Sequence, residues 1–192
     1  MRSIFVLDTE TTGLQGIDHG DKVVEVGIAR VDVGRGKVFP EFGRVVRQDL
    51  SPEDKNACVF FNTDLTPEDV ENAPWTLNQV GRSLIYYESE IFTSYNEDFD
   101  FSRFLNHSPW SFLPKLAPCI MEETAARYSP DGRWFSAQAA YSMLCPDNPA
   151  GLPDGKEQHR ALSDAVVEGH ILIRLLEQNE DIAERFYEVL GE

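Results

Sequence analysis

The sequence predicts an α/β domain in which helices are layered on a β-sheet. Short apolar and alternating segments near the N-terminus have strand spacing, whereas apolar residues in the second half of the chain recur at helical spacing. The length of 192 residues, with 42% hydrophobic content, suits one compact domain with a sizeable core. We therefore expect a single domain over residues 1–192.

The expected strands come early in the chain. Ser3–Leu7 is a short apolar run, and Lys22–Val33 alternates as a half-buried strand does. A Gly-Arg-Gly turn precedes a third candidate, Val38–Arg47, so a β-meander opens the chain. Ile91–Tyr95 is expected to add a further strand.

The expected helices follow the meander. Ser or Thr before Pro and acidic residues marks short helix starts near Ser51 and Thr66. Apolar spacing predicts longer helices over Trp75–Tyr87, Phe99–Leu105, Ile120–Tyr128, Phe135–Leu144 and His159–Leu176, and a polar, acidic one near Asp181–Leu190. The Pro- and Gly-rich stretch Cys145–Gln158 is expected to be a loop that can close on a substrate.

The charge and the cysteines exclude several classes of protein. A formal charge of −16 argues against tight, non-specific binding to duplex DNA, although bound divalent cations can bridge an acidic site to phosphate. Three widely spaced cysteines, Cys58, Cys119 and Cys145, argue against a disulfide framework or a cysteine zinc site, and so favour a reducing, cytoplasmic location. We expect no signal peptide, because the first apolar run is too short, and no membrane span.

The first chemical motif is DTETTG, residues 8–13, at the end of the first expected strand. Asp8 and Glu10 are two residues apart, so both carboxylates project from the same side of an extended chain and can converge on one hard cation. The alternative is that the two acids merely end a strand before a turn.

The second motif is HRALSD, near the start of the long amphipathic helix. His159 and Asp164 are five residues apart, more than one helical turn, so an acid on the helix and a histidine just before it or on its first turn can face one cleft. One could bind metal while the other moves a proton. The alternative is a surface histidine and an acid that caps the helix.

The third motif, NEDFD, contains three acids with different settings. Asn96 can cap a helix whose first turn holds Glu97 and Asp98, which are well placed at the positive end of the helix dipole. Asp100 instead lies between two phenylalanines on an apolar face, where a carboxylate is costly unless it is paired or bound to metal.

Together, DTETTG, NEDFD and HRALSD resemble the three motifs of the DnaQ-like DEDDh superfamily of 3′→5′ exonucleases, which includes proofreading subunits, ribonuclease T and oligoribonuclease. VVEVGIARVDV, PCIMEETAARYSP and HRALSDAVVEGHILIRLL look most like bacterial exonuclease X and its relatives, and the similarity spans nearly the whole chain. The resemblance implies a ribonuclease-H-like fold, a mixed central β-sheet flanked by α-helices.

The resemblance also implies a site and a reaction. Asp8, Glu10, Asp100 and Asp164 would hold two divalent metal ions, Mg²⁺ or Mn²⁺, about 3.5–4 Å apart. His159 would act as the general base in hydrolysis that releases nucleoside 5′-monophosphates from DNA 3′ ends. Thr11, Leu14 and Gln15 are candidates for contacts with the terminal nucleotide, and Leu14 is either a stacking residue or a core residue.

Three binding partners are considered for this chain: DNA, RNA and a basic protein. DNA is favoured over RNA through the resemblance alone, and an exoribonuclease or oligoribonuclease has the same motifs. A non-catalytic protein could instead present its acidic surface to a polymerase or another basic protein. The candidate phosphate partners are few: Arg47, Arg103, Arg133 and Arg160, and the alternative for each is a solvated surface charge. We therefore expect distributive action on single-stranded or short ends. For the aromatic residues Trp110, Trp134, Phe135 and Tyr141 we expect core packing.

Overall fold

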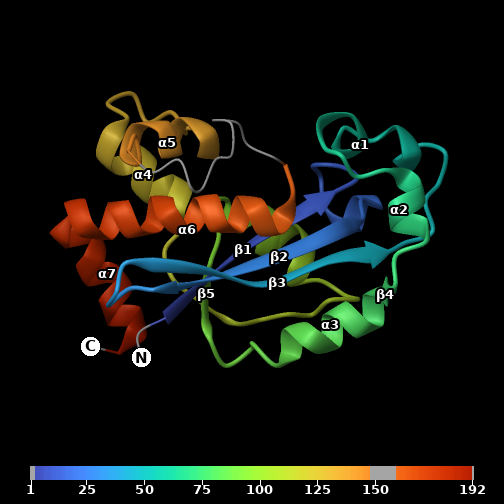
Figure 1. Cartoon of the computed structure of the whole chain (residues 1–192), viewed down its shortest axis with the longest axis horizontal. Helices are drawn as coiled ribbons and strands as arrows, with labels where there is room; N and C mark the ends of the chain where they lie inside the picture. Colours follow the sequence, from blue (N-terminus) through green and yellow to red (C-terminus); the bar gives the residue numbers. More distant parts are fainter. Residues whose placement is uncertain (1–2, 148–158, 192) are drawn as a thin grey trace.

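The computed structural model describes residues 3–147 and 159–191, which form a mixed sheet with helices on both faces (Figure 1). The six strands lie in the order β4-β3-β2-β1-β5-β6. β1 pairs antiparallel with β2 and parallel with β5; β2 and β3 are antiparallel, and β4 and β6 join the two edges in parallel. Their bounds are β1 Ser3–Thr11, β2 Val23–Asp32, β3 Lys37–Arg47, β4 Trp75–Thr76, β5 Ile91–Thr93 and β6 Lys115–Leu116.

The predicted meander is present, and β1 is longer than predicted. β1 continues past Leu7 to Thr11, so the acids of the first motif lie inside the strand and keep its alternation. β4 replaces the first two residues of the predicted helix 75–87, and β6 was not predicted. A strand of two residues is too short to show a period of two, so alternation alone cannot reveal it.

The helices largely follow the predicted ranges. Thr66 and Thr76 form capping boxes at the starts of α2 and α3, each with its side chain accepting from the backbone N–H three residues on. The helices are α1 Val59–Asn62, α2 Pro67–Glu71, α3 Leu77–Ile85, α4 Ile120–Tyr128, α5 Ala137–Leu144, α6 Ala161–Gln178 and α7 Glu180–Leu190, and two 3₁₀ turns occupy Ile17–His19 and Asp54–Asn56.

The predicted helix over Phe99–Leu105 is a π-helix, η3, spanning Asp98–Leu105. The N–H of Asn106 donates to the carbonyl of Phe101 at 2.9 Å, five residues back. The wider turn places the buried residues four and five positions apart, and Asp100, Phe101, Phe104 and Leu105 all face the interior.

Two apolar layers cover the two faces of the sheet. Ile4 and Val6 pack under α6 with residues of α4, α5 and α7, whereas Phe5 and Leu7 pack against α3 and η3. Figure 1 shows α6 along one face and α3 on the other. By alternation, Asp8 and Glu10 continue the row of Ile4 and Val6, and so they emerge on the α6 face.

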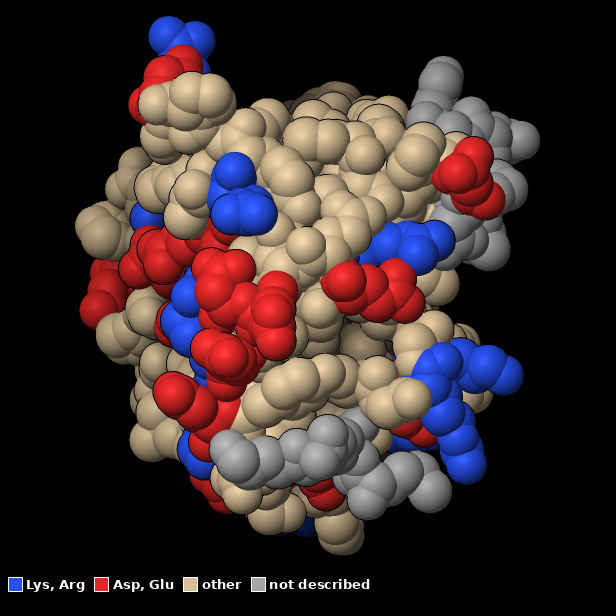
Figure 2. All heavy atoms as spheres, turned by 90° about the vertical axis from the view of Figure 1, so that its left-hand side faces the viewer, with Lys and Arg blue, Asp and Glu red and all other residues tan. Residues whose placement is uncertain are grey.

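Several composition-based expectations can be compared with the described residues. All three cysteines are free, and Cys119 and Cys145 are buried. No helix in the described ranges has the length and apolar character needed to cross a bilayer. Figure 2 shows acidic side chains gathered on the side of the molecule where α7 lies, and the exposed acids of that helix are Glu180, Asp181, Glu184 and Glu188.

Candidate active site

A row of small residues lets the start of α6 lie directly on the sheet beside Asp8. Asp8 pairs in register with Gly27 on β2, and Gly27 pairs with Gly43 on β3. A Cβ at Gly27 would lie 2.1 Å from the backbone carbon of Ala161, and one at Gly43 would lie 2.9 Å from the Leu162 side chain. Because neither glycine has a side chain, the first turn of α6 can reach the backbone of β2.

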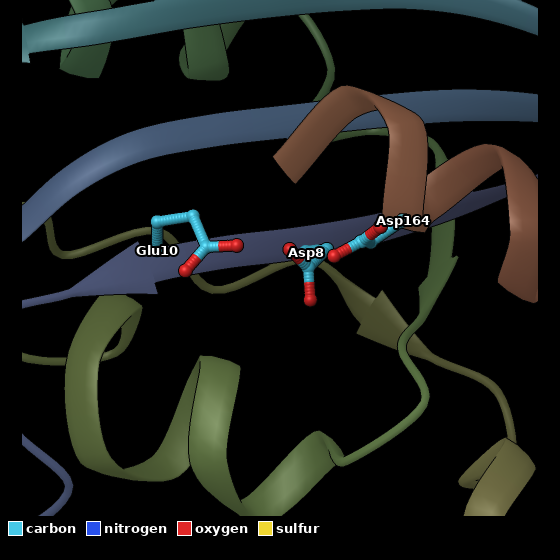
Figure 3. A group of neighbouring side chains, drawn as sticks. All are labelled: Asp8, Glu10 and Asp164. Carbon is cyan, nitrogen blue, oxygen red and sulfur yellow. The ribbon is translucent and has the colours of Figure 1, made fainter. Parts of the chain in front are cut away.

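This seating brings Asp164 to the acids of β1. One carboxylate oxygen from each of Asp8, Glu10 and Asp164 lies within 4.8 Å of the other two. Figure 3 shows the three side chains converging, two from the strand and one from the helix. Clustered carboxylate oxygens are the donor set that hard divalent cations such as Mg²⁺, Mn²⁺ and Ca²⁺ prefer, so these residues fit a divalent metal.

Asp100 reaches the same cavity from η3. Its Oδ1 accepts hydrogen bonds from the Thr9 N–H at 3.1 Å and from the Thr9 hydroxyl at 2.7 Å, and the residue is 2% exposed. Thr9 lies between Asp8 and Glu10 on β1, so this pair of bonds fixes Asp100 next to the motif acids. Asp98, by contrast, is exposed and pairs with Arg103 at 2.6 Å.

The carboxylates strongly disfavour one another's charge. Burial raises the pKa of Asp8 well above its usual value, and the nearby charges of Glu168, Asp100 and Asp164 raise it further. Burial raises the pKa of Glu10 to about 9, with Asp164 and Glu25 adding to the effect and Arg160 opposing it. The pKa of Asp100 is raised to about 7 by burial, against the hydrogen bonds from Thr9. Such a cluster is stabilised in its charged form by a cation.

His159 lies at the entrance to the site. It is exposed, lines the same cavity as the acids and precedes α6 by two residues. Its φ of 50° is in the left-handed region, which costs energy for a residue other than glycine. The predicted loop before it lies, from residue 148 to 158, outside the described residues.

The cavity has a volume of about 450 Å³ and is lined by five acids and by three wall segments. One wall is Thr11–Leu14, from the end of the first motif onwards, and the third is Phe135–Ala137 before α5; between them in the sequence, Cys58, Val59, Asn62 and Thr63 form another. Its size and its acidic floor suit a small phosphorylated group held through a cation.

Two of the three predicted substrate contacts line the cavity, and the third does not. Thr11 and Leu14 line the cavity, and Leu14 is 72% exposed, so the reading of Leu14 as a core residue is wrong. Gln15 lies outside the lining, and its N–H donates to Asp21 at 2.8 Å. Asp21 also accepts from Gly16, while Arg103 donates to the Leu14 carbonyl, so this loop is held from two sides.

Two parts of the site were not predicted from the sequence, namely Glu168 and the wall from Cys58 to Thr63. Glu168 is a further buried acid, 3% exposed, that lines the cavity and accepts a hydrogen bond from the Tyr95 N–H at 3.3 Å. It lies four residues after Asp164, so the spacing of one helical turn in DAVVE is the signal that would have found it. The wall from Cys58 to Thr63 had no local signal.

The arginines and aromatic residues partly follow the expectations. Three of the four candidate phosphate partners make ion pairs, Arg160 with Glu25 and Asp64, Arg103 with Asp98, and Arg133 with Asp131. Trp110 and Tyr141 are buried as predicted. Trp134 is 67% exposed, so the expectation of core packing is wrong there, and Phe135 is partly buried and lines the cavity.

Known proteins resemble this chain over nearly its whole length. The RNase T family model, described as an exonuclease, matches residues 5–172. Exodeoxyribonuclease 10 of Escherichia coli K12 is 31% identical over 188 residues, covering 97% of this chain and 74% of that protein.

Solved structures are also similar. A structure of exonuclease X in complex with 5′ overhanging duplex DNA has a TM-score of 0.60 and 28% identity, covering 97% of this chain and 98% of that one. The nuclease domain of 3′hExo, a DEDDh family member bound to rAMP, has a TM-score of 0.64 at 18% identity and covers 92% of each chain, which supports the fold alone.

Proposed function

This chain belongs to the RNase T exonuclease family of DnaQ-like 3′→5′ exonucleases, and from that premise we propose that it removes nucleoside 5′-monophosphates from DNA 3′ ends. The observation that carries the proposal is the convergence of Asp8, Glu10 and Asp164 within 4.8 Å, with Asp100 bonded to the residue between the first two. DNA is favoured because the E. coli relative is named an exodeoxyribonuclease and the exonuclease X structure contains duplex DNA.

In the proposed reaction, the four carboxylates of Asp8, Glu10, Asp100 and Asp164 would hold two divalent ions, Mg²⁺ or Mn²⁺. When bound, such ions lower the pKa of a water and stabilise negative charge on the leaving 3′ oxygen. Thr9 holds the carboxylate of Asp100 at the interior end of the site through two hydrogen bonds. The carboxylates thus provide a rigid anionic floor beneath the terminal phosphodiester.

His159 takes the proton of the attacking water as the general base. Its exposure at the cavity entrance supports this role, because the proton must then pass to solvent before the next cycle. Histidine is the side chain best suited to such transfers near neutral pH. The terminal nucleotide lies against Thr11 and Leu14, whose side chain is free to stack on a base, and near the loop at Gln15.

The substrate is held weakly along the rest of its length. Arg103 and Arg160 engage Asp98, Glu25 and Asp64, which leaves these guanidinium groups less able to pair with phosphates. We therefore propose distributive hydrolysis of single-stranded or short 3′ ends, with affinity that falls as salt rises.

The test is hydrolysis of 5′-labelled DNA oligonucleotides, single-stranded, blunt and 3′-tailed, with an RNA oligonucleotide of the same sequence. We expect a ladder that shortens from the 3′ end of DNA in Mg²⁺ or Mn²⁺ and no ladder in EDTA. Preferential cleavage of the RNA would replace the DNA assignment with an exoribonuclease. No cleavage of either nucleic acid would refute the proposal.

A matched pair of variants tests the site within the same motif. Asp100→Asn keeps an acceptor for Thr9 but removes a charge from the metal-binding set, so we expect a loss of about 100-fold or more in kcat. Asp98→Asn changes an exposed ion pair, a type of interaction worth about 0–1 kcal/mol, and should retain most of the activity. Equal losses in the two variants would contradict the assigned roles.

A further inference from the structure

Glu25 is a buried acid near the start of β2 that receives three hydrogen bonds from the residues at the start of α6. Arg160 donates to it twice, from Nε at 2.9 Å and from Nη2 at 2.7 Å, and the Ala161 N–H donates at 3.2 Å. The Glu25 residue is 5% exposed. A buried carboxylate is costly without such partners, and the two-pronged pairing with a guanidinium fixes the direction of both groups.

The same arginine extends to the wall of the cavity. Arg160 Nη1 donates to Asp64 Oδ1 at 2.7 Å, and Asp64 directly follows the wall segment Cys58–Thr63. One guanidinium therefore connects β2, the chain after α1 and the residue that precedes α6. We call Glu25, Arg160 and Asp64 the arginine bridge.

The arginine bridge lies next to two of the proposed catalytic groups, Glu10 on β1 and His159 before α6. Glu25 pairs in register with Glu10 on β1, so the two acids are direct neighbours across the strands. Arg160 follows His159, whose left-handed backbone conformation persists only where neighbouring contacts hold it. The bonds made at positions 160 and 161 provide that restraint on the side of α6.

We infer that Glu25 and Arg160 are positioning residues, which set the backbone at His159 and the first turn of α6 so that His159 and Asp164 face Asp8 and Glu10. This inference rests on the proposed function for its catalytic meaning. Neither residue touches the reacting atoms in this role. Asp64 extends the restraint to the cavity wall, so one network orients two sides of the site.

A direct contact of Arg160 with substrate phosphate is the competing role. Three of the N–H groups of Arg160 already donate to Glu25 and Asp64, and its side chain is 31% exposed. Lysine distinguishes the two roles, because it keeps the charge that a phosphate needs but cannot reproduce the planar fork that grips Glu25.

The experiment compares kcat and KM on 3′-tailed DNA in Mg²⁺ for Arg160→Gln, Arg160→Lys, Glu25→Gln and the double variant Glu25→Gln/Arg160→Gln. We expect each single variant to lower kcat about 10- to 100-fold, the range typical of residues that orient catalytic ligands, with little change in KM. The double variant should lose no more than the worse single variant, because both residues act through one interaction. A raised KM with an unchanged kcat, restored by Arg160→Lys, would overturn the inference in favour of a phosphate contact.

A matched control separates positioning from general stability. Arg185 on α7 makes the same two-pronged pair with Glu123 on α4, and neither residue lines the cavity. Arg185→Gln removes a pair of the same geometry at a more exposed place, with the arginine side chain 45% exposed, and should lower Tm while keeping kcat. If Arg185→Gln and Arg160→Gln lose kcat equally, the effect is one of stability and the inference fails.

A second measurement is independent of nuclease activity. The chain has four histidines, so ring signals in histidine-labelled protein can be followed by NMR and assigned through His159→Gln. Arg160→Gln and Glu25→Gln should shift the His159 ring signals and leave those of His107 in place. Unchanged His159 signals in both variants would overturn the inference. If the wild-type protein cleaves no nucleic acid but the variants still shift the His159 signals, the inference is supported and only the proposed function is refuted.

Discussion

Gly27→Ala tests whether the seating of α6 on the sheet creates the site. The added Cβ would lie 2.1 Å from the backbone carbon of Ala161 and 2.2 Å from the Leu162 nitrogen. Both are backbone atoms, so no side-chain rotation can relieve the contact. Taking the 2.1 Å contact to an ordinary 3.4 Å requires the start of α6 to withdraw by roughly 1.3 Å.

This displacement acts directly on the proposed catalytic residues. Asp164 lies on the first turn of α6, and one of its carboxylate oxygens lies within 4.8 Å of oxygens of Asp8 and Glu10, the arrangement that would let the three share a cation. A misplacement of about 1 Å in a catalytic site can lower the rate about 100-fold. Overpacking of this kind also costs about 1–3 kcal/mol of stability, or about 2–4 °C in Tm for each kcal/mol.

The assay measures kcat on a single-stranded oligonucleotide, together with Tm by calorimetry at saturating Mg²⁺. Gly81→Ala is the control, because Gly81 lies within α3 and, apart from the neighbouring residues and backbone of its own helix, no atom lies within 4 Å of its added Cβ. It should raise stability by up to about 1 kcal/mol and leave kcat unchanged. Wild-type activity and Tm in Gly27→Ala would refute the reasoning, since α6 could not then lie against Gly27 as described.

Three further predictions concern the acids and the loop after β1. In EDTA, burial and repulsion by neighbouring acids raise the folded-state pKa of Asp8, and that of Glu10 to about 9, while burial raises the pKa of Asp100 to about 7. The contribution of these groups to stability is therefore full below about pH 4 and is lost as the pH rises through 7 to 9. Mg²⁺ binds the charged carboxylates, so the increase in Tm on adding Mg²⁺ should be larger near pH 9 than near pH 6, and calorimetry that finds the reverse would contradict this. Leu14→Ala should leave Tm nearly unchanged, because the side chain is 72% exposed, but weaken DNA binding by up to about 2 kcal/mol if a base buries the Leu14 side chain; an unchanged KM argues against this contact. Asp21→Ala removes the acceptor for two loop N–H groups and should raise KM more than it lowers kcat, and a pure kcat effect in steady-state kinetics would show that the loop does not bind substrate.

Predictions about single elements succeeded where the pattern is local. The alternation in Lys22–Val33 and the helical spacing in Ile120–Tyr128 correspond to β2, within a residue at each end, and to α4. Asp8 and Glu10 share a face because side chains in a strand alternate, whatever the strand packs against. The distinction between Asp98 and Asp100 also followed from local setting, since one lies on a polar turn and the other between phenylalanines.

The sequence did not reveal features that depend on distant contacts. η3 adopts π rather than α geometry, although its apolar spacing fits either type of turn. Leu14 is exposed, although an isolated leucine is compatible with a core position. Arg160 resembled a solvated charge or a phosphate partner, because nothing near it in the chain indicates that Glu25 lies within 2.7 Å.

The sequence by itself determined which residues are candidates for the chemistry, because residue type, alternation and helical spacing are properties of one segment at a time. The tertiary structure decided how these residues meet. Gly27 and Gly43 admit α6 to the sheet, Thr9 holds Asp100, and Glu25 holds Arg160 across 135 residues of chain. These contacts join residues far apart in the sequence, and their positions depend on the packing of the whole sheet against α6.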